Sequence, residues 1–280
     1  MQASSPPGKQ SRLRQALSSK LLPLFFQLML VFMYLPILVL AVYSVNDSRF
    51  SAKWEGFTLR WYPAFFGNER LVTALQRSLI IAILAVAIAA VLGTLMAVGL
   101  ARYRFRGKTL YRGVSYLPLI VPDITMAVGA LVVLLGVFHL KLSMWTIVAA
   151  HIVFCLSYIA VVVSARLAGM DPQLEEAALD LGATPAEAFV KVLLPELAPG
   201  ILSGCLLSFI LSMDDFLIAS FTAGPGVGTL PMEIFSLINK GGVKPDINAL
   251  SVILILASAA IAFIAEYIRF QTERKRLADQ

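Results

Sequence analysis

The sequence from Asp171 to Glu196, DPQLEEAALDLGATPAEAFVKVLLPE, is a polar segment between two apolar runs of membrane-spanning length. Its pattern predicts two short helices joined by a turn. Asp171 is a suitable N-cap for the first helix, with Pro172 at the first helical position. This helix has one apolar stripe with the i, i+3, i+4, i+7 spacing, formed by Leu174, Ala177, Ala178 and Leu181. So much order between two spans predicts a surface that binds a partner.

The turn and the second helix follow directly. Gly182 suits the left-handed residue that ends a helix. Thr184 and Glu187 fit a capping box, and a second apolar stripe follows at Phe189, Val192 and Leu193. Pro195 is predicted to end this helix. The alternative is an amphipathic hairpin lying on the membrane surface, but the first stripe lacks the large apolar anchors of such a helix.

The composition of the whole chain is that of a membrane protein. Hydrophobic residues make up 59% of the chain and charged residues 14%, and the mean hydropathy is +0.81. Soluble domains carry about a quarter charged residues. Six apolar runs are long enough to cross a bilayer core of about 30 Å, which takes about 20 helical residues. These runs predict an all-α integral membrane protein with six transmembrane helices, at about 21–45, 78–101, 114–138, 143–165, 197–221 and 247–268.

Charge placement predicts the side of the membrane that each loop faces. With the N-terminus inside, the larger share of the 23 Lys and Arg residues lies on the cytoplasmic side, as the positive-inside rule requires. Both termini and the 171–196 segment are then cytoplasmic. We expect a disordered basic tail at 1–20, a six-span membrane domain at 21–270 and a cytoplasmic tail at 271–280. The net charge of +6 is explained by topology and lipid contact, so no nucleic acid partner is expected.

The sequence contains no pattern typical of an enzyme or a metal site. Cys155 and Cys205 fall within predicted spans and have no paired spacing. His139 and His151 lack a Cys or carboxylate at ligand spacing, so we expect them to make polar contacts between helices. No GxxxxGK[ST] phosphate loop is present, which places any ATP hydrolysis in another subunit. We therefore expect no enzymatic activity and no cofactor.

Acidic residues at membrane depth are the clearest functional signal within the spans. Asp123 lies in LPLIVPDITMAVG, and Asp214 and Asp215 lie in LSFILSMDDFLIASF. An ionisable group costs at least about 2.5 kcal/mol at this depth, so such groups usually face a cavity or a partner. Adjacent carboxylates point about 100° apart on a helix, so both face one lumen only if it is wide or the helix is broken. Asp123 follows Pro122 and suits a helix cap equally well.

A route lined with carboxylates favours cationic solutes. Aromatic rings beside it add cation–π attraction to ammonium groups, and the candidates are Tyr158, Phe216 and Phe221. The predicted topology puts Glu233 and Asp246 near the outer mouth of such a route. The predicted substrate pathway thus consists of Asp214, Asp215, Asp123, Phe216, Asp246 and Glu233.

The 171–196 segment resembles the EAA loop of type I ABC importer permeases, whose fold is the MetI-like fold. The matching residues are Glu176, Ala177, Ala178, Gly182, Leu194 and Pro195. The resemblance implies that this loop docks on a cytoplasmic ABC ATPase dimer and that ATP-driven motion enters here. It also implies a second permease subunit, expected to be a different, homologous chain, and an extracytoplasmic binding protein.

Other segments resemble the permeases of putrescine/spermidine importers. They are WEGFTLRWYPAFF, VPDI, LSMDDFLIASFTAGPGVGTLPMEIFS and KPDINALS, and the likeness extends from about residue 25 to 270. It implies polyamine transport across a bacterial inner membrane. Asp123 and Asp246 stand where Glu is equally expected, which leaves the size of the substrate open.

Two alternative functions remain at this point. One is a permease of the same superfamily for another organic cation or an amino-acid-like solute. The other is a stand-alone secondary transporter. Such transporters commonly contain internal repeats, and none is evident between residues 1–140 and 141–280.

Overall fold

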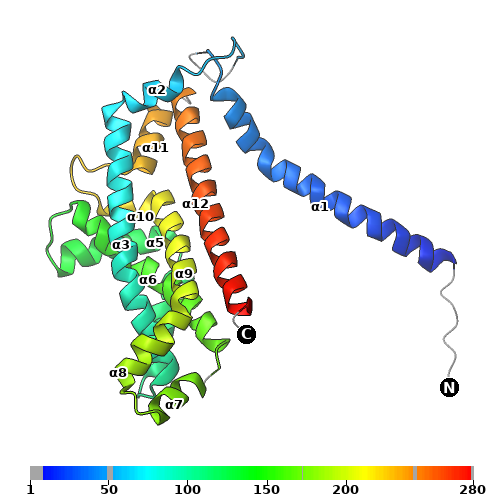
Figure 1. The fold of residues 1–280 in the computed structure, drawn as a ribbon. Coiled ribbons are helices and arrows are strands. Elements are labelled where there is room, and N and C mark those ends of the chain that lie inside the picture. The colour runs from blue at the N-terminus through cyan, green and yellow to red at the C-terminus, as the bar shows by residue number, and fades with distance from the viewer. Residues whose placement is uncertain (1–8, 49–52, 172, 242–244, 279–280) are drawn as a thin grey trace. The chain divides into compact units, whose positions relative to one another are not determined.

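The computed structural model describes residues 9–48, 53–171, 173–241 and 245–278, and these are almost entirely helical (Figure 1). The helices are α1 (Lys9–Tyr43), α2 (Trp61–Phe66), α3 (Glu69–Arg102), α4 (Lys108–Tyr116), α5 (Asp123–Val132), α6 (Met144–Ala168), α7 (Gln173–Asp180), α8 (Pro185–Ala188), α9 (Leu194–Asp214), α10 (Leu217–Thr222), α11 (Leu230–Gly241) and α12 (Pro245–Ala278). Three further turns are the 3-10 helix η1 (Leu117–Leu119) and the π-helices η2 (Val133–Val137) and η3 (Phe189–Leu193).

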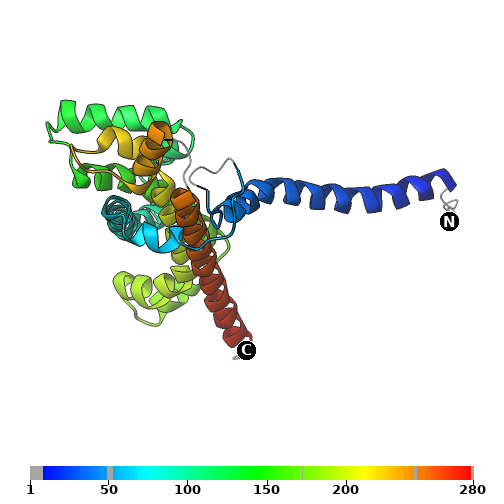
Figure 2. The ribbon, with the colours of Figure 1, turned by 90° about the horizontal axis from the view of Figure 1, so that it is seen from above.

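The chain divides into two compact units, residues 1–67 with 241–265 and residues 68–240 with 266–280. In the first unit, α1 is one continuous helix despite Pro23 and Pro36, as Figures 1 and 2 show. Helix therefore includes residues 9–20, which the sequence assigns to a disordered tail; residues 1–8 of that tail lie outside the described residues. The apolar part of α1, Leu21–Tyr43, has no buried residue in its most apolar window.

The loop after α1 is organised by Asn46, whose side chain is fully buried. Its amide nitrogen donates to the carbonyl of Lys53 at 2.7 Å, and its amide oxygen accepts the N–H of Glu55 at 2.9 Å. The indole of Trp61 donates to the Asn46 carbonyl at 2.7 Å. These contacts give the aromatic segment after α1 a fixed conformation.

In the second unit, α3, α6 and α9 lie side by side and form the core (Figure 1). Small residues allow this close packing, as is usual between membrane helices. A Cβ added at Gly93 of α3 would lie 2.9 Å from the carbonyl oxygen of Leu156 on α6. A Cβ at Gly204 of α9 would lie 3.2 Å from the Cα of Ile159, also on α6. Helix α6 therefore packs closely against a helix on each side.

Four helical segments are long and apolar enough to cross a membrane: Leu21–Tyr43, Glu69–Arg102, Met144–Ala168 and Pro185–Asp214. The pair Lys108–Leu119 and Asp123–Val137 becomes a fifth if it counts as one broken span, since its halves are bent by 111°. The apolar part of α12 is shorter, Pro245–Ala260. Among the described residues the all-α membrane architecture is thus clear, whereas the predicted count of six is reached only if both of these segments cross.

Candidate functional site

The predicted span at 197–221 is interrupted at the acidic pair. Helix α9 ends at Asp214, Asp215 is extended with φ −66° and ψ 123°, and α10 starts at Leu217. The two carboxylate oxygens of Asp215 accept the N–H groups of Ile218 at 3.2 Å and Ala219 at 2.7 Å. The Asp215 carboxylate therefore provides hydrogen-bond acceptors for N–H groups in the first turn of α10, which lack carbonyl partners because no helical turn precedes them.

A second break lies before α5. Pro122 is extended, with φ −56° and ψ 141°, and its neighbour Asp123 is the first residue of the new helix. No side chain caps this helix end. The expectation that Asp123 might act as a cap is therefore wrong, because Pro122 occupies the capping position. A carboxylate in the first turn is still stabilised by the positive end of the helix dipole.

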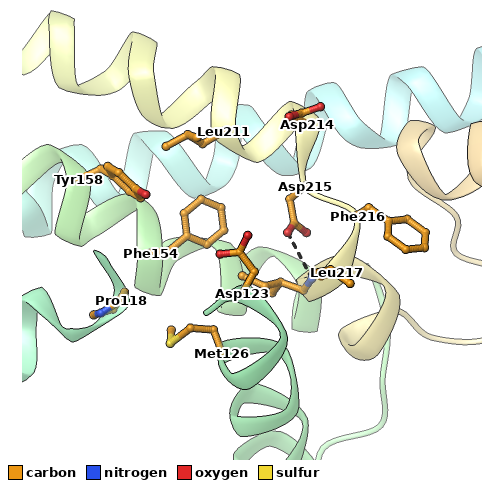
Figure 3. A pocket seen from close by; sticks show the side chains of 11 residues that line it. Pro118, Asp123, Met126, Phe154, Tyr158, Leu211, Asp214, Asp215, Phe216 and Leu217 are labelled. Carbon is orange, nitrogen blue, oxygen red and sulfur yellow. Dashed lines mark hydrogen bonds between the residues drawn. The ribbon is translucent and has the colours of Figure 1, made fainter. Parts of the chain in front are cut away.

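The two breaks face one cavity of about 290 Å³. Its lining includes all three carboxylates of the spans, and Figure 3 shows Asp123 and Asp215 pointing toward each other while the Asp214 carboxylate points away from both. The other lining residues are Pro118, Met126, Phe154, Tyr158, Leu211, Phe216, Leu217 and Ile218. The sequence indicates that both adjacent carboxylates face one lumen only if the lumen is wide or the helix is broken, and the helix is broken at Asp215.

The three carboxylates differ in their contacts. Asp215 has two backbone donors, and its Oδ2 also lies 3.2 Å from Nε2 of His151. Asp123 and Asp214 make no hydrogen bond or ion pair with any part of the chain that the structure describes. A carboxylate without a partner at membrane depth is costly. Asp123 and Asp214 are therefore the groups best placed to bind a cation, whereas the Asp215 carboxylate accepts backbone N–H groups at the start of α10.

Aromatic rings form much of the cavity wall. Two of the three rings predicted for cation–π contact, Tyr158 and Phe216, line it, and Phe216 packs against Phe235 with 4.6 Å between ring centroids. The third, Phe221, packs instead against the core around α6. Phe154, which the sequence did not single out, lines the cavity and is 7% exposed. An apolar phenylalanine within an apolar span gives no sequence signal of such a role.

The remaining predicted pathway residues lie elsewhere. Glu233 on α11 forms an ion pair with Arg70, and its side chain is 16% exposed. Asp246 lies in the first turn of α12, where its carboxylate accepts the N–H of Ile247 at 3.0 Å. Neither residue belongs to the cavity lining.

The caps predicted in the 171–196 segment are present. The Asp171 carboxylate accepts the N–H of Gln173 at 2.9 Å, while Pro172 lies outside the described residues. Gly182 has a left-handed φ of +89°. Thr184 and Glu187 form the reciprocal capping box of α8. Hydrogen bonds from Thr184 and the Lys191 ammonium lower the pKa of the Glu187 carboxyl to about 2.

Pro195 does not end the second helix, contrary to the prediction. The helical segment runs from Pro185 through to Asp214, and the π-helix η3 immediately precedes Leu194 and Pro195. A proline inside a helix removes one N–H and clashes with the preceding turn. A π-helical turn is one of the few ways in which a helix accommodates such a disruption.

The two apolar stripes of this segment have different environments. In the second stripe Leu193 is 2% exposed. In the first, Leu174 is 44% and Leu181 89% exposed, and Glu176 and Ala177 beside them are also exposed. Helix α7 contacts η3 and α8, and a 2.8 Å ion pair joins its Glu175 to Arg102 at the end of α3. None of these contacts covers Leu174 or Leu181 among the described residues. The apolar stripe of α7 is thus free to meet a partner.

Within the described residues no group of three or more His, Cys, Asp or Glu side chains is arranged to hold a metal ion. Cys155 and Cys205 are both free thiols. His139 contacts the backbone carbonyl of Leu135, and His151 lies between Ser212 and Asp215. The expected polar contacts between helices are therefore present for His151.

Comparisons with known proteins agree with this architecture. A family model described as "Binding-protein-dependent transport system inner membrane component" matches residues 89–276. The putrescine transport system permease protein PotI of Escherichia coli (strain K12) is 42% identical over 254 residues, which cover 89% of this chain and 90% of that protein. The spermidine/putrescine transport system permease protein PotC of the same strain is 40% identical over 244 residues, covering 87% and 92%.

Solved structures establish the fold. A bacterial alginate ABC transporter in complex with a periplasmic protein carrying an alginate pentasaccharide aligns with a TM-score of 0.70 at 17% identity, covering 93% of this chain and 96% of that chain. The inward-facing MetNI methionine ABC transporter aligns with a TM-score of 0.57 at 23% identity, covering 71% and 94%. The chain therefore has the MetI-like permease fold and belongs to the inner membrane components of binding-protein-dependent transport systems.

Proposed function

We infer that this chain is a permease subunit of an ATP-driven polyamine importer, a non-catalytic component that carries a putrescine- or spermidine-like cation into the cytoplasm. The single observation that carries the inference is the cavity at the two helix breaks. It has walls of Phe154, Tyr158 and Phe216 and two carboxylates without a partner among the residues that the structure describes. Carboxylates and aromatic faces together suit ammonium groups. The names of the matched relatives, putrescine and spermidine/putrescine permeases, support the same substrate class.

Six spans suit this function. We propose that they are formed by α1, α3, the bent α4–α5 pair, α6, the part of α9 beyond residue 196 with α10, and α12. Both termini and the 171–196 segment then lie in the cytoplasm, the side favoured by the distribution of Lys and Arg. The membrane domain extends over residues 21–270, and the short tail at 271–280 follows it.

We propose that α7 and the turn after it are where a cytoplasmic ATPase dimer docks. Glu176, Ala177, Ala178 and Gly182 lie on or next to an exposed apolar stripe, which suits a helix-in-groove contact. Leu194 and Pro195 are the first residues of α9, which runs from this docking region to the cavity. A second permease chain, different from this one but homologous, and an extracytoplasmic binding protein complete the importer; the matched relatives carry two distinct permease names.

Purification through a tag on this chain, followed by reconstitution of the complex in liposomes, tests the proposal. We expect the complex to contain an ATPase and a second permease, and radiolabelled putrescine or spermidine to enter only with ATP and a loaded binding protein. A neutral amino acid is the control solute. ATP-independent uptake would favour a secondary transporter, and ATP-driven uptake of the amino acid without polyamine uptake would contradict the substrate class.

A further inference from the structure

The cavity carboxylate Asp215 lies beside a buried histidine that the proposed route does not itself use. His151 lies on α6 and is 1% exposed. Its Nδ1 is 2.8 Å from the hydroxyl of Ser212 on α9, and its Nε2 is 3.2 Å from Oδ2 of Asp215. Asp215 is the only charged side chain within ion-pair distance of the ring among the described residues. A buried imidazole is thus wedged between α9 and the start of α10.

His151 is the middle of three buried polar contacts between α6 and the broken span. On one side, the Ser208 hydroxyl donates to the carbonyl of Cys155 at 3.3 Å. On the other, the Thr146 hydroxyl donates to the carbonyl of Thr222 at the end of α10 at 2.7 Å. Polar contacts of this kind fix neighbouring helices within a membrane. Only the His151 contact reaches the break itself.

The geometry favours a neutral ring. Nε2 is close to Oδ2, yet its N–H is not directed at that oxygen well enough to form a hydrogen bond. An imidazolium and a carboxylate form a short, directed bond when they pair. The Ser212 hydroxyl can donate to an unprotonated Nδ1, and a proton on Nε2 then avoids placing a nitrogen lone pair against the carboxylate.

We propose that His151 is the positioning residue for Asp215, acting as a neutral imidazole with its proton on Nε2. The edge of the imidazole ring fixes the Asp215 carboxylate at the break between α9 and α10. Because the ring is neutral, the negative charge of Asp215 remains available to the cavity. A protonated ring would cancel that charge and weaken the attraction of the cavity for a cation. The inference rests on the proposed cation route, which it extends to a residue outside the cavity lining.

The protonation state is tested first, without reference to transport. The chain contains two histidines, and the exposed His139 is replaced in a His139→Gln variant, so that His151 is the only histidine left in this chain. This chain alone is labelled with ¹⁵N-histidine and reassembled with unlabelled partner subunits, and solid-state NMR in lipid at neutral pH should then show one protonated and one unprotonated ring nitrogen. The protonated nitrogen should be Nε2. Two protonated nitrogens, or a proton on Nδ1 alone, would overturn the proposal whichever solute the complex carries.

Positioning is tested by polyamine uptake per ATP hydrolysed in the reconstituted complex, a ratio that a change in assembly alone does not move. His151→Leu should lower this ratio on the order of ten-fold, while His151→Gln, which is neutral but retains a donor and an acceptor, should restore most of it. Ser208→Ala, which removes a neighbouring contact between α6 and α9, should leave the ratio unchanged. An unaltered ratio in the Leu variant, or equal losses in the Leu and Gln variants, would refute the positioning role.

Ser212→Ala decides the question if His151→Leu fails to assemble. It leaves the imidazole in place but removes the partner of Nδ1, so the uptake-to-ATP ratio should fall about three-fold. No change in this variant would overturn the proposal. Wild-type uptake in the same experiment tests the proposed function separately. A wild-type complex that transports no polyamine would contradict the proposed substrate class. The NMR measurement would still decide the protonation state of His151 in that case.

Discussion

Asp214 and Asp215 are adjacent residues of like chemistry, yet they have different contacts at the break between α9 and α10. Asp215 accepts two backbone N–H groups and lies beside His151, so its carboxylate has fixed neighbours within the chain. Asp214, one residue earlier, has no such partner in the described chain and is the last residue of α9. The sequence pattern predicts that the pair is functional. It does not show which carboxylate accepts backbone hydrogen bonds, because that depends on where the helix breaks.

Replacement of each aspartate by asparagine should separate these roles. Asp215→Asn keeps only one acceptor oxygen, and a weakened cap costs about 1 kcal/mol, so we expect less assembled complex as well as lower uptake. Asp214→Asn should assemble normally and lose uptake alone. Size-exclusion yield and uptake per assembled complex measure the two effects, with Glu69→Gln at the exposed start of α3 as the control. Equal assembly of the two aspartate variants would contradict the assignment.

Gly182 is constrained by its backbone and not by space. Its φ is +89°, and an added Cβ would meet no atom within 4 Å. Gly182→Val should therefore strain the turn by roughly 1–2 kcal/mol, misdirect α8 and reduce transport per ATP hydrolysed without loss of insertion. Gly113→Ala on α4 is the matched control, since that site is equally open but helical. Normal coupling in the valine variant would exclude a role for this turn in docking.

Among the elements, the capped helix ends were predictable from the sequence, and the irregular turns were not. The capping box at Thr184 and Glu187 depends on residues three apart, so its signal is local. The continuation of the helix past Pro195 depends on the π-helix η3, whose sequence contains no such signal. At the break, Asp215 accepts the N–H groups of Ile218 and Ala219, and an apolar run on both sides of the acidic pair does not reveal that the helix restarts there.

The capping box of α8 has a defined pH dependence. Because hydrogen bonds lower the pKa of Glu187 from 4.5 to about 2, the stabilisation is complete above pH 4.5 and is lost as the pH falls toward 2. We expect ¹³C NMR of labelled glutamate to show the Glu187 carboxyl still ionised at pH 3.5. Thr184→Ala removes the hydroxyl that contacts this carboxyl and should raise the midpoint. A wild-type midpoint near 4.5 would show that the box does not form in solution.

The ion pair between Arg102 and Glu175 links α3 to α7. Both side chains are about a third or less exposed, and pairs of this kind contribute up to about 1 kcal/mol. Arg102→Glu should place two like charges together, displace α7 and lower the amount of ATPase that copurifies. The exchange Arg102→Glu with Glu175→Arg should restore it, and Arg104→Glu, at an exposed neighbouring site, should have little effect. No recovery in the exchanged pair would contradict the link.

At the scale of the whole molecule, composition and charge predicted the class of the protein because bilayer thickness and loop charge act on long stretches of sequence. Pro118 and Pro122 predict an interruption between Lys108–Leu119 and Asp123–Val137, but the size of the bend there, 111°, was not predictable from the sequence. The cavity formed by the two breaks brings together residues nearly a hundred positions apart, and only the folded chain shows this.

Reporter fusions test the six-span topology. Fusions after Arg106 and after Gln280 should report a cytoplasmic location, and fusions near Asn68 and Gly226 an external one, because the Lys and Arg distribution favours this orientation. Alkaline phosphatase and green fluorescent protein fusions at each site give opposite readouts and control for expression. A reporter on the wrong side at any of these positions would require a different number of spans.

The central claim is that the cavity carboxylates without partners carry the cation. The most direct measurement compares ATP-driven putrescine uptake per assembled complex between wild type and the double variant Asp123→Asn/Asp214→Asn. The amide keeps the size of the carboxylate but cannot offset the desolvation of an ammonium group. We predict normal assembly with uptake reduced on the order of ten-fold or more. Unchanged uptake by a normally assembled double variant would contradict the assignment of this cavity.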